Sequence, residues 1–262
     1  MPVTLGWFKA DLHVHTCLSP CADLSMGPRA IVARAAEQGL DLVGISDHNS
    51  AENAPAVIEA ARGRRFKVLP GMEVTSREEV HVLALFDCIE SALRLQEIVY
   101  EHLPGENNAA AFGPQVVVDA DDDVLGFNNR LLAGATELPV EQLVEFIHRL
   151  DGVAIASHAD RKAFGILGQL GFIPAELPLD ALEISSNTTI EAARRHYPGC
   201  ARRAMVRFSD AHSIKEIGSS VTWFLLSDGT VAEIRKGLMG VEGRGLVVDE
   251  ARVPADTGPT FG

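Results

Sequence analysis

Cysteine is scarce in this chain, and the cysteines that are present follow no familiar pattern. The four cysteines lack the spacing of a zinc finger and are too few to form a disulfide framework: Cys17, Cys21, Cys88 and Cys200. The first residues contain no basic segment followed by an apolar run, and no charge-free apolar stretch reaches the length of a membrane span. We therefore expect a cytoplasmic protein with no membrane attachment.

Basic residues are also in the minority, with 23 lysines and arginines against 36 acidic residues and a formal charge of −13. Stable binding of long nucleic acid normally requires a basic face, so this balance argues against such a complex. Anionic substrates remain possible, because bound cations can reverse the sign of the charge inside a cleft. A glycine-rich phosphate loop of the Walker or dinucleotide-binding type is absent as well.

Apolar runs of strand length alternate with helix-like segments along most of the chain. Strands are predicted at 8–15, 42–46, 66–72, 80–86, 152–156, 182–185, 204–208 and 222–226. Helices are predicted at 28–39, 50–62, 89–102, 138–150, 163–170, 189–196 and 231–238. Such alternation predicts an α/β domain with a parallel sheet and helices outside it, either open or closed into a barrel.

The alternation is interrupted between residues 104 and 136. Val116–Val118 and Val124–Phe127 flank an acidic turn at Asp121–Asp123, which predicts an inserted hairpin. The predicted domain covers residues 1–240 and includes this insertion. The segment 241–262 is rich in glycine, proline and charge, and it is predicted to be peripheral.

Residues that ligate metals recur at the ends of the predicted strands. His13 and His15 occupy positions i and i+2 of the first strand, so their side chains project from one face. Further candidates accompany the later strands: His48, Glu73, His81, His158, Asp210 and His212, with Asp23 or Cys21 shortly after the first strand. Together with His13 and His15, the set contains six of the nine histidines. Ligands at the C-terminal ends of many strands favour a barrel, because an open sheet usually concentrates its chemistry at one switch point.

Imidazole combined with carboxylate suits zinc, manganese or iron(II) better than calcium or magnesium alone. The number of candidate ligands exceeds the needs of one ion and matches two or three divalent ions. Clustered ions lower the pKa of a bridging water and neutralise charge on a phosphoryl oxygen. We predict that Glu73, at a strand end, is the carboxylate that bridges two ions.

The motifs at the strand ends together resemble the PHP (polymerase and histidinol phosphatase) family, from about Lys9 to Ser213: Asp11-x-His13-x-His15, Asp47-His48-Asn49, Gly71-Met72-Glu73, His81, Ser157-His158 and Asp210-Ala211-His212. The resemblance implies a distorted (β/α)7 barrel, a trinuclear metal site and phosphoesterase activity. It also implies three ligand groups: His13, His15, Glu73 and Asp210 for one metal; Glu73, His81 and His158 for a second; His48, His212 and a residue after the first motif for the third.

The identity of that last residue is open from sequence. Spacing could favour Cys21, whereas residue type favours Asp23 for a hard, hydrolytic metal, and Asp23 is the preferred prediction.

The predicted function is hydrolysis of a small phosphorylated metabolite, a nucleotide or a short oligonucleotide by a metal-bridging hydroxide. Glu73 and Arg161 are the candidate catalytic residues; Arg161 could clamp phosphate or be an ordinary surface arginine. Asp11 and Asp47 could each orient a ligand imidazole or cap local backbone. The alternatives are a histidinol-phosphate phosphatase, a metal-dependent amidohydrolase or a non-catalytic scaffold module.

Overall fold

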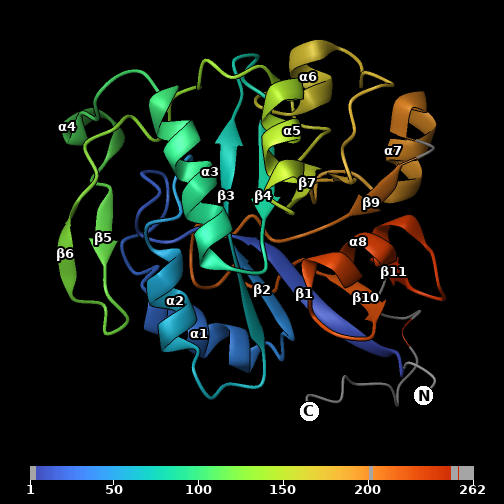
Figure 1. Ribbon diagram of the computed structural model, residues 1–262, viewed down its shortest axis with the longest axis horizontal. Helices are drawn as coiled ribbons and strands as arrows, with labels where there is room; N and C mark the ends of the chain where they lie inside the picture. The colour runs from blue at the N-terminus through green and yellow to red at the C-terminus, as the bar shows by residue number, and fades with distance from the viewer. Residues whose placement is uncertain (1–3, 201–202, 249–252, 254–262) are drawn as a thin grey trace.

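The computed structural model describes residues 4–200, 203–248 and 253, and most of its strands form one sheet that curls into a nearly closed barrel (Figure 1). The strands of this sheet are β1 (Gly6–Val14), β2 (Leu42–Ile45), β3 (Lys67–Thr75), β4 (His81–Leu85), β7 (Val153–Ala156), β8 (Ala181–Glu183), β9 (Ala204–Val206), β10 (Thr222–Leu226) and β11 (Gly245–Val247). Neighbours in the sheet follow the order β11-β10-β1-β2-β3-β4-β7-β8-β9.

Helices follow most of the strands, as the sequence predicts. The longer ones are α1 (Pro28–Glu37), α2 (Ala54–Ala60), α3 (Ile89–Glu101), α5 (Val140–Arg149), α7 (Ile190–His196) and α8 (Val231–Met239). The shorter ones are α4 (Ala109–Phe112), α6 (Ile166–Leu170) and the 3-10 turn η1 (Pro198–Cys200). The predicted distorted α/β barrel is confirmed. No helix in the described ranges is long and apolar enough to cross a membrane.

The expectation of a parallel sheet is only partly correct. β1, β2 and β3 are parallel, as are β7, β8 and β9, but β4 is antiparallel to both of its neighbours. β3 and β4 are joined by a short turn in which the backbone N–H of Ser76 donates to the carbonyl oxygen of Val80 at 2.9 Å. So short a connection can only reverse the chain, because a parallel pair needs a crossover of about a dozen residues. The reversal places His81, at the start of β4, opposite Thr75 at the end of β3.

The insertion contains the predicted hairpin, formed by β5 (Val116–Val118) and β6 (Val124–Phe127) as an antiparallel pair. The hairpin lies at one flank of the barrel, beside α1 and α2 (Figure 1). Its base is held to the barrel by the side-chain amide of Asn49, which donates to the carbonyl oxygens of Leu132 and Gly134 at 2.8 Å. The insertion is thereby tied to the residue that follows His48.

Strand β11 lies in the segment that was predicted to be peripheral, and it extends the sheet beyond β10. Arg244, just before β11, donates to both carboxylate oxygens of Glu233 at 2.8 and 3.0 Å, and the backbone N–H of Ser227 donates to the same group. Desolvation opposes ionisation of Glu233, but these hydrogen bonds lower its pKa to about 2. The buried ion pair therefore fastens this segment to α8. Residues 249–252 and 254–262 of the predicted tail lie outside the described residues.

The strands separate two apolar layers. One face packs against α1, α2, α3 and α5 through residues such as Ile31, Val57, Leu95 and Ile147. The opposite face packs across the barrel interior, where Leu12, Leu69 and Phe224 meet side chains of α8. Burial of these two layers is the main favourable contribution to folding.

An irregularity in β1 turns its histidines toward the end of the barrel. Ala10 and Leu12 face the interior, whereas Val14 packs in the outer layer, and the register with β2 shifts between Asp11 and Val14. The extra residue presses the backbone of Leu12 onto Gly44 of β2. A Cβ atom on Gly44 would lie 2.3 Å from the carbonyl oxygen of Leu12. Glycine within a strand often marks such a bulge or close backbone approach.

Replacing Gly44 by alanine is expected to destabilise the protein by about 2 kcal/mol, because the added methyl group overpacks against fixed backbone. Urea unfolding followed by circular dichroism measures the effect. Gly126→Ala in β6 is the matched control, since nothing lies within 4 Å of a Cβ atom at that position. Equal stability of the two variants would show that the close approach is not structurally required.

Candidate metal centre

Glu73, near the end of β3, lies at the middle of a cluster of imidazoles. Its Oε1 atom lies 3.1 Å from Nδ1 of His81, 3.2 Å from Nε2 of His158 and 3.4 Å from Nε2 of His13. Its Oε2 atom lies 3.1 Å from Nδ1 of His48 and 3.7 Å from Nε2 of His15. The residue is 1% exposed, and no hydrogen bond of standard geometry reaches either oxygen. One buried carboxylate thus faces histidines from four separate strand ends.

Asp210 closes the cluster from the segment after β9. Its Oδ1 atom lies 3.4 Å from Nε2 of His13 and 3.3 Å from Nε2 of His15. The position is fixed by backbone bonds in which His15 N–H donates to the Ala211 carbonyl at 3.0 Å and Ala211 N–H donates to the His13 carbonyl at 3.2 Å. These bonds join the segment after β9 to the end of β1.

Arg161 belongs to the same cluster. Its Nη1 atom lies 2.7 Å from Oδ2 of Asp210 in an ion pair, and its side chain is 39% exposed. The guanidinium therefore lies where the buried carboxylate meets solvent, and it is not an isolated surface group.

Glu183, the last residue of β8, is a site residue that the sequence analysis missed. Its Oε2 atom accepts a hydrogen bond from Nδ1 of His13 at 2.8 Å, and it lies 3.4 Å from the backbone nitrogen of His158. The side chain is 2% exposed. A charged residue at the end of the apolar run Ala181-Leu182 was the available signal, because a buried carboxylate requires a partner.

His15, His48 and His212 form the outer side of the cluster. Their ring nitrogens lie within 4.8 Å of one another, and two further groups with this spacing are His13–His15–Glu73 and His48–Glu73–His81. His212 reaches the cluster from beyond Asp210, and its ring lies 4.2 Å from that of His15. His15, His48 and Glu73 each belong to two of these groups.

Cys21 and Asp23 lie differently with respect to this outer side. Cys21 Sγ lies 3.2 Å from Nε2 of His48. Desolvation opposes ionisation of the thiol, but hydrogen bonds from His212 and His48 lower its pKa to about 6. The carboxylate of Asp23 is exposed and accepts from the backbone N–H of Ser25 at 3.3 Å.

Asp47 and Asp11, whose roles the sequence left open, both hydrogen-bond to groups that adjoin the cluster. Asp47 accepts from the hydroxyl of Ser19 at 2.7 Å, and that hydroxyl lies 3.0 Å from Nδ1 of His15. Asp11 accepts from the backbone N–H groups of Ser209 and Gly218 at 3.0 and 2.8 Å. Asp47 thus contacts a ligand-type histidine through Ser19, whereas Asp11 caps the backbone that carries Asp210.

A second residue that the sequence analysis missed is Phe164, whose ring stacks on that of His81 with centroids 4.4 Å apart. Its carbonyl oxygen accepts from the backbone N–H of His81 at 2.9 Å. The backbone of Phe164 has a φ of 60°, a conformation that bulky residues rarely adopt. The loop after His158 therefore covers and orients His81.

Burial and mutual charge decide the ionisation of this cluster. Desolvation would raise the pKa of Glu73, but His81 and His13 hold it well below its usual value. Desolvation would lower the pKa of His13, but Glu183, Glu73 and Asp210 raise it well above its usual value. Desolvation, reinforced by His212, holds the pKa of His15 well below its usual value. The negative charge that retains a proton on His13 is charge that a divalent cation would neutralise.

The donor set fits divalent metal ions. Glu73 offers two buried oxygens without hydrogen-bond partners, and Nδ1 of His158 and Nδ1 of His81 are also buried without one. Buried polar atoms of this kind are costly unless a partner satisfies them. Imidazoles whose second nitrogen is held by a carboxylate, as His13 is by Glu183, are the usual arrangement of zinc ligands.

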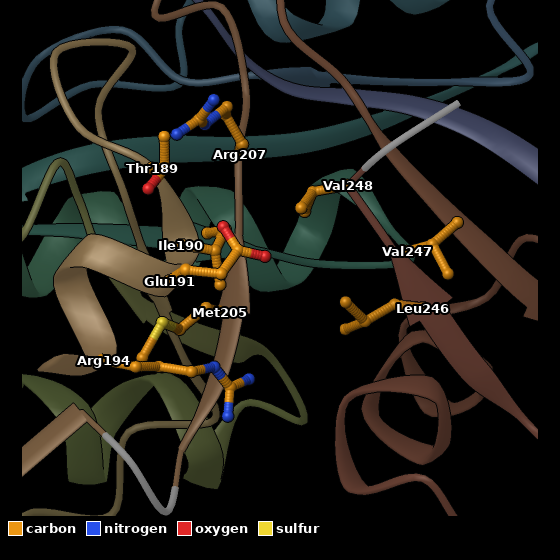
Figure 2. A pocket seen from close by; sticks show the side chains of 9 residues that line it. All are labelled: Thr189, Ile190, Glu191, Arg194, Met205, Arg207, Leu246, Val247 and Val248. Carbon is orange, nitrogen blue, oxygen red and sulfur yellow. The ribbon is translucent and has the colours of Figure 1, made fainter. Parts of the chain in front are cut away.

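A separate cavity of about 410 Å³ lies between α7, β9 and β11 and shares no residue with the histidine cluster. Figure 2 shows Glu191 at its centre, with Arg207 on one side and Arg194 on the other. The cavity mixes charges of both signs with apolar side chains of β11, and its described lining contains neither histidine nor cysteine.

The remaining histidines, His102, His148 and His196, bond to carbonyl oxygens or to Asp180.

The protein is thus a barrel whose strand ends carry a cluster of histidines and carboxylates that could hold metal ions. The PHP domain model matches residues 11–168, which is more than half of the chain. The chain belongs to the PHP domain family, as its motifs predicted. A comparison with curated protein sequences yields no significant match.

Solved structures share the fold at low sequence identity. The lesion-specific endonuclease EndoQ from Pyrococcus furiosus matches with a TM-score of 0.68 and 21% sequence identity. The match covers 92% of this chain but only 57% of the length of that protein. A two-domain protein from Bacteroides vulgatus that contains a predicted PHP-like metal-dependent phosphoesterase matches with a TM-score of 0.54 and 14% sequence identity. The match covers 94% of this chain and 66% of that protein. An amidohydrolase from Chromobacterium violaceum matches with a TM-score of 0.51 and 16% sequence identity. The match covers 80% of this chain and 89% of that protein.

Proposed function

We propose that this chain is a metal-dependent hydrolase of phosphoesters, acting on a small phosphorylated metabolite, a nucleotide or a short oligonucleotide. The observation that carries the proposal is the position of Glu73, whose two oxygens face five imidazoles from opposite sides. A carboxylate in this position can hold two cations close together. Clustered divalent cations would neutralise charge on phosphoryl oxygens and lower the pKa of a water molecule.

The remaining residues have separate roles in this proposal. Three sets of side chains would hold the ions: His13, His15, Glu73 and Asp210; Glu73, His81 and His158; His48 and His212 with one further donor. Glu183 would fix the ring of His13, and Ser19 with Asp47 would fix that of His15. Arg161 would bind a phosphate oxygen at the exposed edge of the cluster, since its guanidinium can donate two parallel hydrogen bonds.

The neighbouring structures support two further substrate classes. One neighbour is named a lesion-specific endonuclease, and another is named an amidohydrolase. Both names describe hydrolysis, so the choice between phosphoester and amide is a question of substrate and not of fold. The net charge of −13 favours small or short anions over long duplex DNA.

The test is hydrolysis of a substrate panel by the protein reconstituted with zinc, manganese or iron(II). The panel contains phosphomonoesters including histidinol phosphate, nucleoside bisphosphates, short single-stranded and abasic oligonucleotides, and N-acyl amides. We expect turnover of at least one phosphoester, and its loss on chelation with recovery when metal is restored. Full metal loading without hydrolysis of any phosphoester would contradict the proposal, and turnover of amides alone would establish the second class.

Replacing Arg161 by alanine is expected to raise KM for the phosphoester substrate about tenfold, because one charge-assisted contact to an exposed phosphate is removed. Steady-state kinetics of Arg161→Ala measure this effect, with Arg149→Ala as the control on the far end of α5. Arg161→Lys keeps the charge but loses the paired donors, so an intermediate KM is expected. An unchanged KM in Arg161→Ala would exclude a phosphate contact.

A further inference from the structure

We propose that Cys21 is a thiolate ligand of the outer metal position, together with His48 and His212. The inference rests on the proposed metal centre and specifies its chemistry. A mixed imidazole and thiolate donor set would make this position selective for zinc or cobalt over manganese. In this proposal the soft thiolate of Cys21 takes the place that the sequence analysis gave to the hard carboxylate of Asp23.

The sulfur of Cys21 already has the spacing of a ligand. Cys21 Sγ lies 3.2 Å from Nε2 of His48, and the ring nitrogens of His48, His15 and His212 lie within 4.8 Å of one another. Two donors on one tetrahedral zinc ion, with a Zn–S bond of about 2.3 Å and a Zn–N bond of about 2.0 Å, lie about 3.5 Å apart. The observed separation is therefore close to that of two ligands of the same ion.

The loop that carries Cys21 is fixed on both sides of the sulfur. Ser19 is held by Asp47 and by the ring of His15, and its carbonyl oxygen accepts from the backbone N–H of Ala22 at 3.0 Å. The backbone N–H of Asp23 donates to the carbonyl oxygen of His212 at 2.8 Å. Ser19 and Asp23, on either side of Cys21, thus fix the loop next to His15, His48 and His212.

Asp23 contributes its backbone and not its carboxylate. The bond from its N–H to His212 turns the side chain outward, where it accepts from the N–H of Ser25. Reaching the cluster would require this turn to open. Of Cys21 and Asp23, it is therefore Cys21 whose side chain faces the histidines.

Thiolate changes the metal preference of a site because sulfur is a softer donor than a carboxylate oxygen. Soft donors favour zinc, whereas carboxylate and water favour manganese and magnesium. Two imidazoles and a thiolate also leave an open position on a four-coordinate ion, as catalytic zinc sites do. The sequence of this loop would thus set the identity of one ion without changing the shared carboxylate of Glu73.

Cobalt substitution tests the ligand directly. The metal-free protein is titrated with Co²⁺, and a thiolate-to-cobalt charge-transfer band is expected in the near ultraviolet. The band should be present in the parent protein and in Cys88→Ser, whose cysteine is exposed at the start of α3. It should be absent in Cys21→Ser and Cys21→Asp, while the weaker visible bands of cobalt with imidazole remain. Persistence of the near-ultraviolet band in Cys21→Ser would overturn the proposal.

Thiol protection gives a second measurement that needs no variant. Alkylation of the parent protein by iodoacetamide, read by peptide mass spectrometry, should slow at least about tenfold at Cys21 when zinc is added. Cys88 is the internal reference, because it is exposed and its sulfur bonds to the hydroxyl of Ser91, away from the histidine cluster. Equal alkylation of Cys21 with and without zinc would exclude ligation.

The two proposals fail in different ways. A charge-transfer band without hydrolysis of any phosphoester would retain Cys21 as a ligand and reject the proposed function. Hydrolysis without the band would retain the function and reject the ligand. We also expect Cys21→Asp to lower the ratio of zinc to manganese bound, measured after dialysis against equal concentrations of both ions, by about tenfold or more. An unchanged ratio would contradict the proposed selectivity.

Discussion

Replacing Glu73 by glutamine is expected to reduce turnover more than a hundredfold while leaving the fold intact. Loss of an outer hydrogen-bond partner of a metal ligand typically costs about 10–100-fold, and loss of a shared ligand should cost more. Glutamine has nearly the same shape as glutamate, so the packing of β3 against β4 is preserved. It carries no negative charge, and its amide nitrogen would face the imidazoles around it.

The measurement combines steady-state kinetics, metal content by mass spectrometry and circular dichroism of Glu73→Gln. Glu97→Gln is the matched control, because Glu97 is an exposed residue of α3. We expect the control to retain full activity and full metal content. Retained turnover in Glu73→Gln would exclude the bridging role and with it the observation on which the proposed function depends.

Replacing Glu183 by alanine is expected to weaken metal binding about a hundredfold, the upper end of the range for such partners. The substitution leaves the Nδ1 atom of His13 without its acceptor at 2.8 Å and removes one buried negative charge from the cluster. The ring of His13 would then be free to change tautomer or to rotate. Weaker binding follows because the imidazole must be fixed again whenever an ion binds.

Competition with a chromophoric chelator measures the metal affinity of Glu183→Ala. Glu183→Gln keeps an acceptor for His13 but loses the charge, so its affinity should lie between those of the parent protein and Glu183→Ala. Glu176→Ala is the control, because Glu176 is exposed. If Glu183→Ala binds metal as tightly as the parent protein, Glu183 has a purely structural role at the end of β8.

Local pattern in the sequence was sufficient for most of the elements and for the histidines of the candidate metal centre. Alternating apolar runs predicted the strands because burial on two faces requires apolar residues throughout. His13, His48 and His158 were found because each lies close to the C-terminal end of such a run, and parallel strands bring these ends together. The hairpin around Asp121–Asp123 was also predicted, because its acidic turn separates two short β-branched segments.

Long-range contacts explain what the sequence analysis missed. Glu183 lies at the end of a predicted strand, but its importance depends on His13, which is 170 positions away. Strand β11 was not predicted because three residues, Gly245–Val247, carry too weak a pattern. Its position depends on the ion pair of Arg244 with Glu233.

The sequence by itself determined the family, the barrel of strands and helices and the residue types of the candidate metal centre, because these follow from local periodicity and short motifs. Tertiary structure alone decided how those residues are combined. The reversal after Thr75 brings His81 to Glu73, and the irregularity in β1 directs His13 and His15 into the cluster. The loop after His15 presents the sulfur of Cys21 and turns the carboxylate of Asp23 outward. Spacing along a chain does not fix the direction of a side chain; backbone hydrogen bonds to distant segments do.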